Sequence, residues 1–229
     1  MTTAAVPHPT PEPHHHTSTG LDNKKIGVWA FIGSECFFFM SLISTYMIYK
    51  GRSMVGPLPH TWWCPSTGAT APEGAGEAFL ASCPDAMAPI LDIPVTSAST
   101  FVLLMSSLTM VLAHSSVARG DRKYSKIWLA TTALLGAAFL GFQAFEFTAF
   151  AHEGLTLSTN LFGSTFFTLT GFHGAHVTAG VIWLFTLLFI DFKRGLGPRD
   201  AINVDICALY WHFVDVIWIV IFTLVYLIQ

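Results

Sequence analysis

Five long apolar stretches, separated by polar segments, run through the sequence. Each is long enough to cross the hydrocarbon core of a bilayer as an α-helix, which takes about 20 residues. None alternates strictly between polar and apolar positions, so the pattern predicts a bundle of helices and not a β-barrel. The predicted spans are residues 26–49, 95–117, 127–150, 161–190 and 206–228, and the fourth is long enough to require tilting or protrusion.

Composition indicates the same class. Apolar residues make up 52% of the 229 residues and charged residues only 11%, against about 25% charged in soluble domains. We therefore predict an all-α integral membrane protein with a five-helix transmembrane domain over residues 24–229. Residues 1–23 are rich in Pro, His and Thr and lack the apolar centre of a cleavable signal, which predicts a disordered tail with three solvated histidines.

Lysine and arginine residues divide unequally between the two sides of this predicted bundle. Nine of the 11 fall on the side that holds the N-terminal tail and the connections after the second and fourth spans. Only Lys50 and Arg52 fall on the other side. The positive-inside rule therefore predicts a cytoplasmic N-terminus, an outside C-terminus and an outer loop formed by residues 51–94.

This outer loop is rich in Pro, Gly, Ala and Ser, and it contains two of the four cysteines, Cys64 and Cys83. The other two, Cys36 and Cys207, lie within predicted spans. Because the outer face of the membrane is oxidising, a disulfide between Cys64 and Cys83 is favoured and would restrain the loop. Two free, unrelated thiols are the alternative.

A few polar side chains interrupt the apolar spans. Glu35 is the one charged residue of the first span and lies near its middle. A charge at that depth costs roughly 2.5 to 3.5 kcal/mol on insertion scales, so we expect Glu35 to face protein and to be functional. On later spans, polar residues three apart share a helix face: Gln143 with Glu146, His173 with His176, and His212 with Asp215.

Two interpretations of this polar set stay open. Glu35 and Asp215 come at similar depth, which predicts a polar layer that is either proton-linked and hydrated or a set of hydrogen bonds between helices. For His173 and His176 we favour hydrogen bonding, because two histidines without a third strong ligand make a poor metal site. The sequence also lacks phosphate-binding, nucleophile-elbow and zinc-protease motifs, so the chain alone is predicted to be non-catalytic.

Small residues recur at four-residue spacing on two spans, which predicts close approach of neighbouring helices there. These residues are Gly171, Ala175 and Ala179 on the fourth span, and Ala137 and Gly141 on the third.

Six short motifs lie in or beside the spans: KIGVWAFIGSE at 25–35, GDRK at 120–123, QAFE at 143–146, GSTFF at 163–167, GFHGAH at 171–176 and YWHFVD at 210–215. In this order they closely resemble subunit III of haem–copper cytochrome oxidases, from about Lys24 to the C-terminus. Six ordered matches are far more specific than any one of them.

The resemblance implies an accessory subunit of a proton-pumping terminal oxidase that carries electrons from cytochrome c to oxygen in a bacterial inner membrane. Haem and copper are then expected on subunits I and II and no cofactor on this chain, which would stabilise subunit I, aid proton uptake and hold phospholipid. Glu35 matches the family's intramembrane glutamate. Lys193 and Arg194 fall where family members place basic residues near lipid phosphates, and Asp205 matches an acid expected to cap the last helix.

The chain departs from seven-helix members of that family in two respects. It lacks their first two helices, and it has the long outer loop, which we expect to contact subunit II, a cytochrome or another respiratory complex. A subunit of a quinol oxidase or a nitric-oxide-reductase accessory protein would use a similar scaffold. A stand-alone proton channel or transporter is the alternative of a different class, motivated by the buried acids.

Overall fold

The structure, a computed structural model, describes residues 22–53 and 55–228. Within them, five helices are long and apolar enough to cross a membrane, which confirms the predicted all-helical membrane class. They are α1 (Asn23–Tyr49), α3 (Ile93–Ala118), α4 (Arg122–His152), α5 (Leu161–Arg194) and α6 (Ala201–Phe222), the last preceded by η2 (Pro198–Asp200) and followed by a π-helical turn, η3 (Thr223–Leu227). The prediction of a disordered tail with solvated histidines falls on residues 1–21, outside the described residues.

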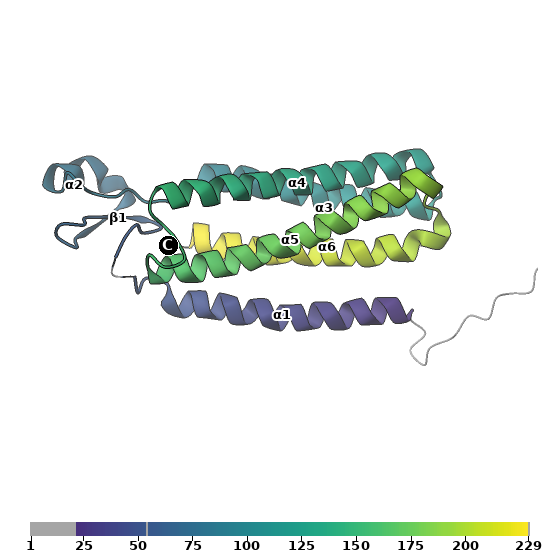
Figure 1. The fold of residues 1–229 in the computed structure, drawn as a ribbon, viewed down its shortest axis with the longest axis horizontal. Coiled ribbons are helices and arrows are strands. Elements are labelled where there is room, and N and C mark those ends of the chain that lie inside the picture. Colours follow the sequence, from purple (N-terminus) through teal and green to yellow (C-terminus); the bar gives the residue numbers. More distant parts are fainter. Residues whose placement is uncertain (1–21, 54, 229) are drawn as a thin grey trace, which may run out of the picture.

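The long helices run side by side along one axis (Figure 1). α3 packs against α4 and α6, α4 packs against α5, and α5 packs against α6, so these four form a bundle. α1 lies along the outside of this bundle and contacts α5 and α6. The end of the bundle where α1 begins is opposite the end that carries the C-terminus and the small domain formed by the outer loop (Figure 1).

Polar side chains at the first turns fix where the helices begin. Asp22, Asp92, Asp121 and Asn160 each accept a hydrogen bond from a backbone N–H of the helix that follows. These caps extend the helices past the apolar stretches, so Asn23 belongs to α1 and not to the tail as predicted. Because α6 already begins at Ala201, Asp205 lies inside that helix, and the expectation that it caps the helix is wrong.

The centre of the bundle is formed by Trp211, which is fully buried on α6. Its ring lies against Gly136 of α4 and Gly180 of α5, and its Nε1 donates to Ser106 Oγ of α3 at 2.9 Å. A Cβ on either glycine would come within 3 Å of the ring. One side chain therefore joins four helices at the point where glycine allows the closest approach.

The small residues that were predicted from their four-residue spacing to allow close helix approach do not include Gly136 or Gly180. A Cβ on Gly141 or Gly171 would meet nothing within 4 Å, and Ala175 and Ala179 are exposed on the surface of the chain. For these four residues the predicted close approach of a neighbouring helix is not found within the described chain, whereas Ala137 is partly buried and packs against the core. Four-residue spacing identifies a helix face but not which neighbour covers it.

The outer loop folds into a small domain. Its strands β1 (Thr61–Trp63) and β2 (Thr70–Pro72) pair antiparallel and are followed by η1 (Glu73–Ala75) and α2 (Gly76–Ser82). Cys64 and Cys83 form a disulfide with 6.0 Å between their Cα atoms, which ties β1 to the end of α2. At its base, Lys50 donates hydrogen bonds to the Leu224 and Ile228 carbonyls, and burial lowers the pKa of Lys50.

Candidate functional site

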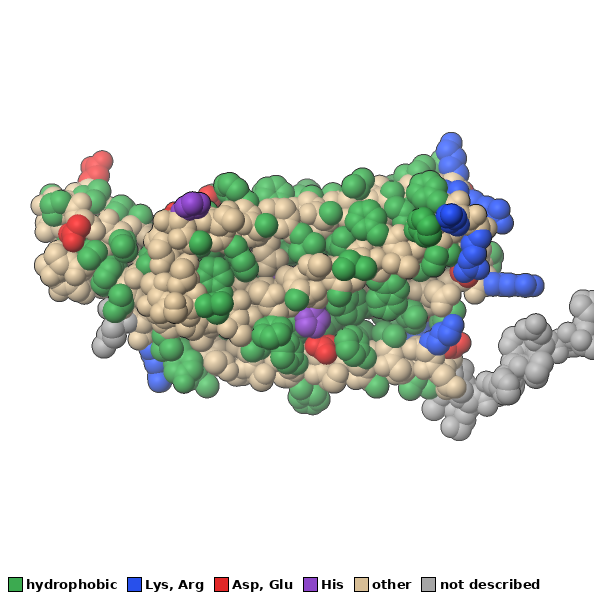
Figure 2. All heavy atoms as spheres, in the orientation of Figure 1, with side chains coloured by type: hydrophobic (Ala, Val, Ile, Leu, Met, Phe, Trp, Pro, Cys, Tyr) green, Lys and Arg blue, Asp and Glu red, His purple; other side chains and the backbone are tan. Residues whose placement is uncertain are grey.

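The intramembrane acid Glu35 pairs with a histidine from another helix. Glu35 Oε2 on α1 lies 3.1 Å from His176 Nε2 on α5, and the two side chains are 18% and 17% exposed. Figure 2 shows a histidine beside an acidic side chain near the middle of the bundle's length. Glu35 thus faces protein on one side, as expected, and retains partial exposure at the seam between α1 and α5.

The hydrogen bonds of His176 define where a proton can sit. Its Nδ1 lies 2.7 Å from the Phe172 carbonyl, and because a carbonyl oxygen only accepts, Nδ1 carries a hydrogen. Nε2 then either accepts a proton from a neutral Glu35 or donates one to the Glu35 carboxylate. In both states the bond holds a single proton, so the pair can exchange between a neutral and an ion-paired form without a change in its net charge.

Aromatic residues hold this pair in place. The rings of Phe38 and Phe39 lie 6.2 and 4.9 Å from the His176 ring, centroid to centroid. Tyr210 on α6 donates its hydroxyl hydrogen to the His176 carbonyl at 2.9 Å. The imidazole therefore has a fixed orientation in a weakly polar environment, which strengthens its interaction with the Glu35 carboxyl group.

His173, although three residues from His176, has different neighbours. It is fully buried, its ring stacks on Trp218 at 4.9 Å, and Phe139 contacts its edge. Neither of its ring nitrogens has a hydrogen-bond partner among the described residues. The expected hydrogen bonding of His173 between helices is therefore not found, because residues three apart are offset by about 60° around a helix and point to different neighbours.

The other predicted polar residues occupy separate interhelical contacts. His212 Nδ1 lies 2.5 Å from Ser107 Oγ of α3, and the buried Asp215 lies near the same serine. Glu146 on α4 accepts a hydrogen bond from Thr96 on α3. Glu35 pairs with His176, whereas neither carboxylate oxygen of Asp215 has a hydrogen-bond partner among the described residues, so hydrogen bonds do not join these acids into the single polar layer that was predicted.

Two polar clusters at the end of the bundle where α1 begins were not predicted from the sequence. Asp191 on α5 is fully buried and accepts from Ser125 Oγ at 2.7 Å and from the Leu196 N–H at 2.8 Å. Lys25 on α1 forms a 2.7 Å ion pair with Asp205 on α6. Asp191 follows the last apolar residue of its span, so a search confined to apolar stretches passes over it.

Within the described residues, the histidines and cysteines are not gathered at one place. The four histidines of the spans lie in separate contacts: His114 is beside Asp205, His173 is against Trp218, His176 is against Glu35 and His212 is against Ser107. Among the described residues, the one group of three close metal-type ligands is Cys64, Cys83 and Asp85, and its two sulfurs are joined in the disulfide. A disulfide sulfur is not a thiolate, so this group lacks the ligands that a metal would need.

These features define a multi-pass helical membrane protein with polar pairs between its helices, and comparisons with known proteins are specific about its family. The sequence model of cytochrome c oxidase subunit III matches residues 10–229. The chain is 37% identical over 215 residues to cytochrome c oxidase subunit 3 of Bacillus sp. (strain PS3), which covers 94% of this chain and 90% of the relative. It is 38% identical over 202 residues to quinol oxidase subunit 3 of Bacillus subtilis (strain 168), which covers 88% and 85%.

A third relative, cytochrome bo(3) ubiquinol oxidase subunit 3 of Pseudomonas aeruginosa, is 33% identical over 214 residues, or 93% of this chain and 89% of that protein. The chain belongs to the cytochrome c oxidase subunit III family. It is accordingly an accessory subunit of a haem–copper oxidase and a multi-pass protein of a bacterial membrane.

Proposed function

We propose that this chain carries no redox centre and packs against the catalytic subunit of its oxidase, subunit I, while haem and copper lie on subunits I and II. The separate placement of its histidines and the disulfide between its two outer cysteines support this proposal. α1 has a largely exposed surface, which a second subunit or lipid would cover. The visible spectrum of the purified oxidase, after selective removal of this chain, tests the proposal: haem and copper absorbance should stay with the larger subunits.

Within that role, we infer that the Glu35–His176 pair holds a proton that is linked to turnover. The observation that carries this is the 3.1 Å contact between the Glu35 carboxyl group and the His176 imidazole, midway along two membrane-spanning helices, which is a hydrogen-bonding distance. The partial exposure of both side chains leaves a route for that proton toward whatever covers the seam between α1 and α5. His173, His212, Asp215 and Glu146 then serve helix packing.

Replacing Glu35 with Gln tests this role in the intact oxidase. Gln cannot exchange its hydrogen with His176 but retains the size and hydrogen-bonding capacity of the side chain. We expect unchanged haem content and subunit composition, with slower proton uptake or a progressive loss of activity over many turnovers. Ser34→Ala, next to Glu35 on the exposed surface of α1, is the matched control. Kinetics of Glu35→Gln equal to those of the control would reduce the pair to a packing contact.

For the electron donor we propose cytochrome c, with a quinol as the second candidate. Quinol stays a candidate because the chain is about equally identical to the cytochrome c oxidase subunit and to the quinol oxidase subunit of the two Bacillus relatives, at 37% and 38%. Reduction of the purified oxidase by reduced cytochrome c and by a soluble quinol, each measured under anaerobic conditions, separates the two. Rapid reduction by quinol alone would replace cytochrome c in this proposal.

We further propose that the outer domain docks subunit II, a cytochrome or another respiratory complex. Its disulfide and strand pair give it a fixed shape, and Val55, Leu80 and Met87 expose apolar surface there. Replacing residues 61–87 with a short Gly-Ser linker should weaken donor binding or supercomplex association while the helices remain assembled. Unchanged donor affinity and association would reject this docking role.

A further inference from the structure

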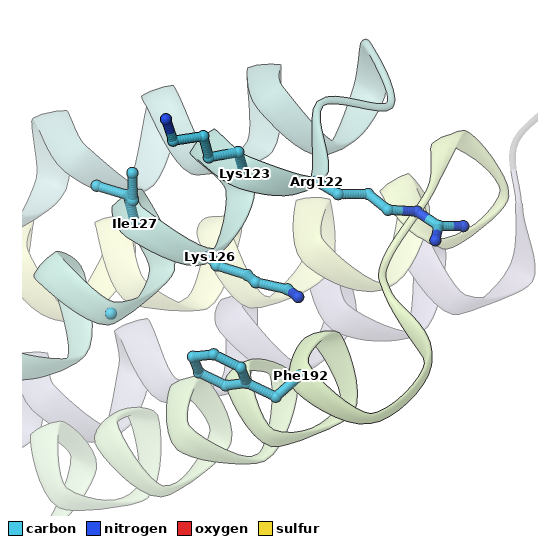
Figure 3. A pocket seen from close by; sticks show the side chains of 6 residues that line it. Arg122, Lys123, Lys126, Ile127 and Phe192 are labelled. Carbon is cyan, nitrogen blue, oxygen red and sulfur yellow. The ribbon is translucent and has the colours of Figure 1, made fainter.

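A hollow of about 590 Å³ lies between the first turns of α4 and the last turns of α5. It is lined by Arg122, Lys123, Lys126, Ile127, Ala130 and Phe192 (Figure 3). It lies at the end of the molecule where basic side chains gather, opposite the outer domain (Figure 2). With the predicted cytoplasmic N-terminus, the hollow lies at the level of the lipid headgroups on the cytoplasmic side of the bilayer.

The three cations of this pocket are not neutralised within the described part of the chain. None of them forms an ion pair with a carboxylate there. The two acids of this region are already engaged, since Asp121 caps α4 and Asp191 accepts from Ser125 and from the Leu196 N–H. Because no carboxylate forms an ion pair with Arg122, Lys123 or Lys126 among the described residues, these cations are available to an anion from outside the chain.

The pocket has a charged edge and an apolar floor. Arg122 and Lys126, one turn apart on α4, extend toward the same end of the helix, whereas Lys123 extends from the other side (Figure 3). The Lys126 ammonium lies 5.3 Å from the centre of the Phe192 ring. Ile127, Ala130 and Phe192 supply the floor, so the site is amphipathic over a short distance.

We propose that this pocket binds one anionic phospholipid. Arg122 and Lys126 hold its phosphate, since a guanidinium can bind phosphate through two hydrogen bonds, and Lys123 adds charge at the edge. One acyl chain lies along Ile127, Ala130 and Phe192. A free phosphate ion would leave this apolar floor uncovered, which favours a lipid as the occupant.

The site differs from the one inferred at Lys193 and Arg194 by family resemblance. Neither Lys193 nor Arg194 lines the pocket, and the Arg194 guanidinium is already paired with Asp200 at 2.9 Å. The pocket proposal needs the chain to lie in a membrane but does not depend on a proton-linked Glu35 or on the electron donor. Its failure would leave the proposed function untouched.

Native mass spectrometry of the purified oxidase can count the lipids that stay on this subunit when it is released. The complex is delipidated and then supplied with phosphatidylglycerol or phosphatidylcholine. We expect one phosphatidylglycerol to be retained by the wild type, and roughly tenfold weaker retention by R122Q/K126Q, since each basic residue near a membrane surface contributes a several-fold effect. R119Q/R199Q removes two exposed charges from the same end, outside the pocket, and should behave as wild type.

Ala130→Trp provides a second variant, because it fills the floor without a change in charge. It should also lose the lipid while subunit retention stays normal. Equal loss in R122Q/K126Q and R119Q/R199Q would show general attraction to charge and overturn the proposal. Equal retention of phosphatidylcholine would overturn the preference for an anionic lipid, and displacement by inorganic phosphate at low concentration would identify a phosphate site instead.

Discussion

At Gly136 and Gly180, the lack of a side chain decides how closely α4 and α5 approach the ring of Trp211. The sequence predicts that small residues matter in the spans, yet it does not identify these two. Whether a glycine is covered depends on which neighbour reaches it, and that is set by the tertiary arrangement. The same applies to His173 and His176, whose spacing suggested a shared environment although one faces Trp218 and the other Glu35.

Gly180→Ala should therefore destabilise the bundle. Its Cβ would lie 2.8 Å from the Trp211 ring, which is fixed by a hydrogen bond from Nε1 to Ser106. Overpacking of this kind costs about 1–3 kcal/mol, of which the better helix propensity of alanine offsets up to about 1 kcal/mol. We expect a lower midpoint of thermal unfolding in detergent. Gly171→Ala and Gly141→Ala meet open space and are the controls, so equal midpoints for all three variants would contradict this account.

At the scale of elements, the apolar pattern predicts the five spans because bilayer thickness fixes their minimum length. The pattern does not predict the helix ends, which depend on single capping residues such as Asp92 and Asn160. It also misses the secondary structure of the outer loop, where Pro, Gly and Ser indicate irregular chain. There the strand pair and α2 are held by the disulfide and by the packing of Trp62 and Trp63 against Gly76 and Gly56.

Removing the disulfide with C64S/C83S should loosen the outer domain and leave the bundle intact. A cross-link that closes a loop of this length stabilises by about 3 kcal/mol in the chain-entropy account, and the domain has few other buried side chains. Limited proteolysis of the intact oxidase should then cleave within residues 65–82 several-fold faster than in wild type. Protease resistance equal to that of wild type would show that packing alone maintains this domain. Ser66→Ala, next to the disulfide, is the control for local disturbance.

At the scale of the whole molecule, charge and architecture agree on a polarity along the bundle axis. The basic residues gather at the end opposite the outer domain (Figure 2), and the ion pair between Lys25 and Asp205 joins α1 to α6 at that end. The proposed lipid pocket lies there as well. A protein with this asymmetry gains electrostatic attraction to anionic lipid on one face of the membrane, which favours a single orientation.

That orientation can be measured with single cysteines placed at the two ends. Thr67→Cys lies on the exposed surface of the outer domain and Arg119→Cys on the connection between α3 and α4. If the N-terminus is cytoplasmic, a membrane-impermeant maleimide added to intact spheroplasts should label Thr67→Cys, and Arg119→Cys should react only after the membrane is opened. The native free cysteines, Cys36 and Cys207, lie within the spans and set the background. The reverse labelling pattern would invert the bundle, place the outer domain in the cytoplasm and remove the basis for its contact with an external electron donor.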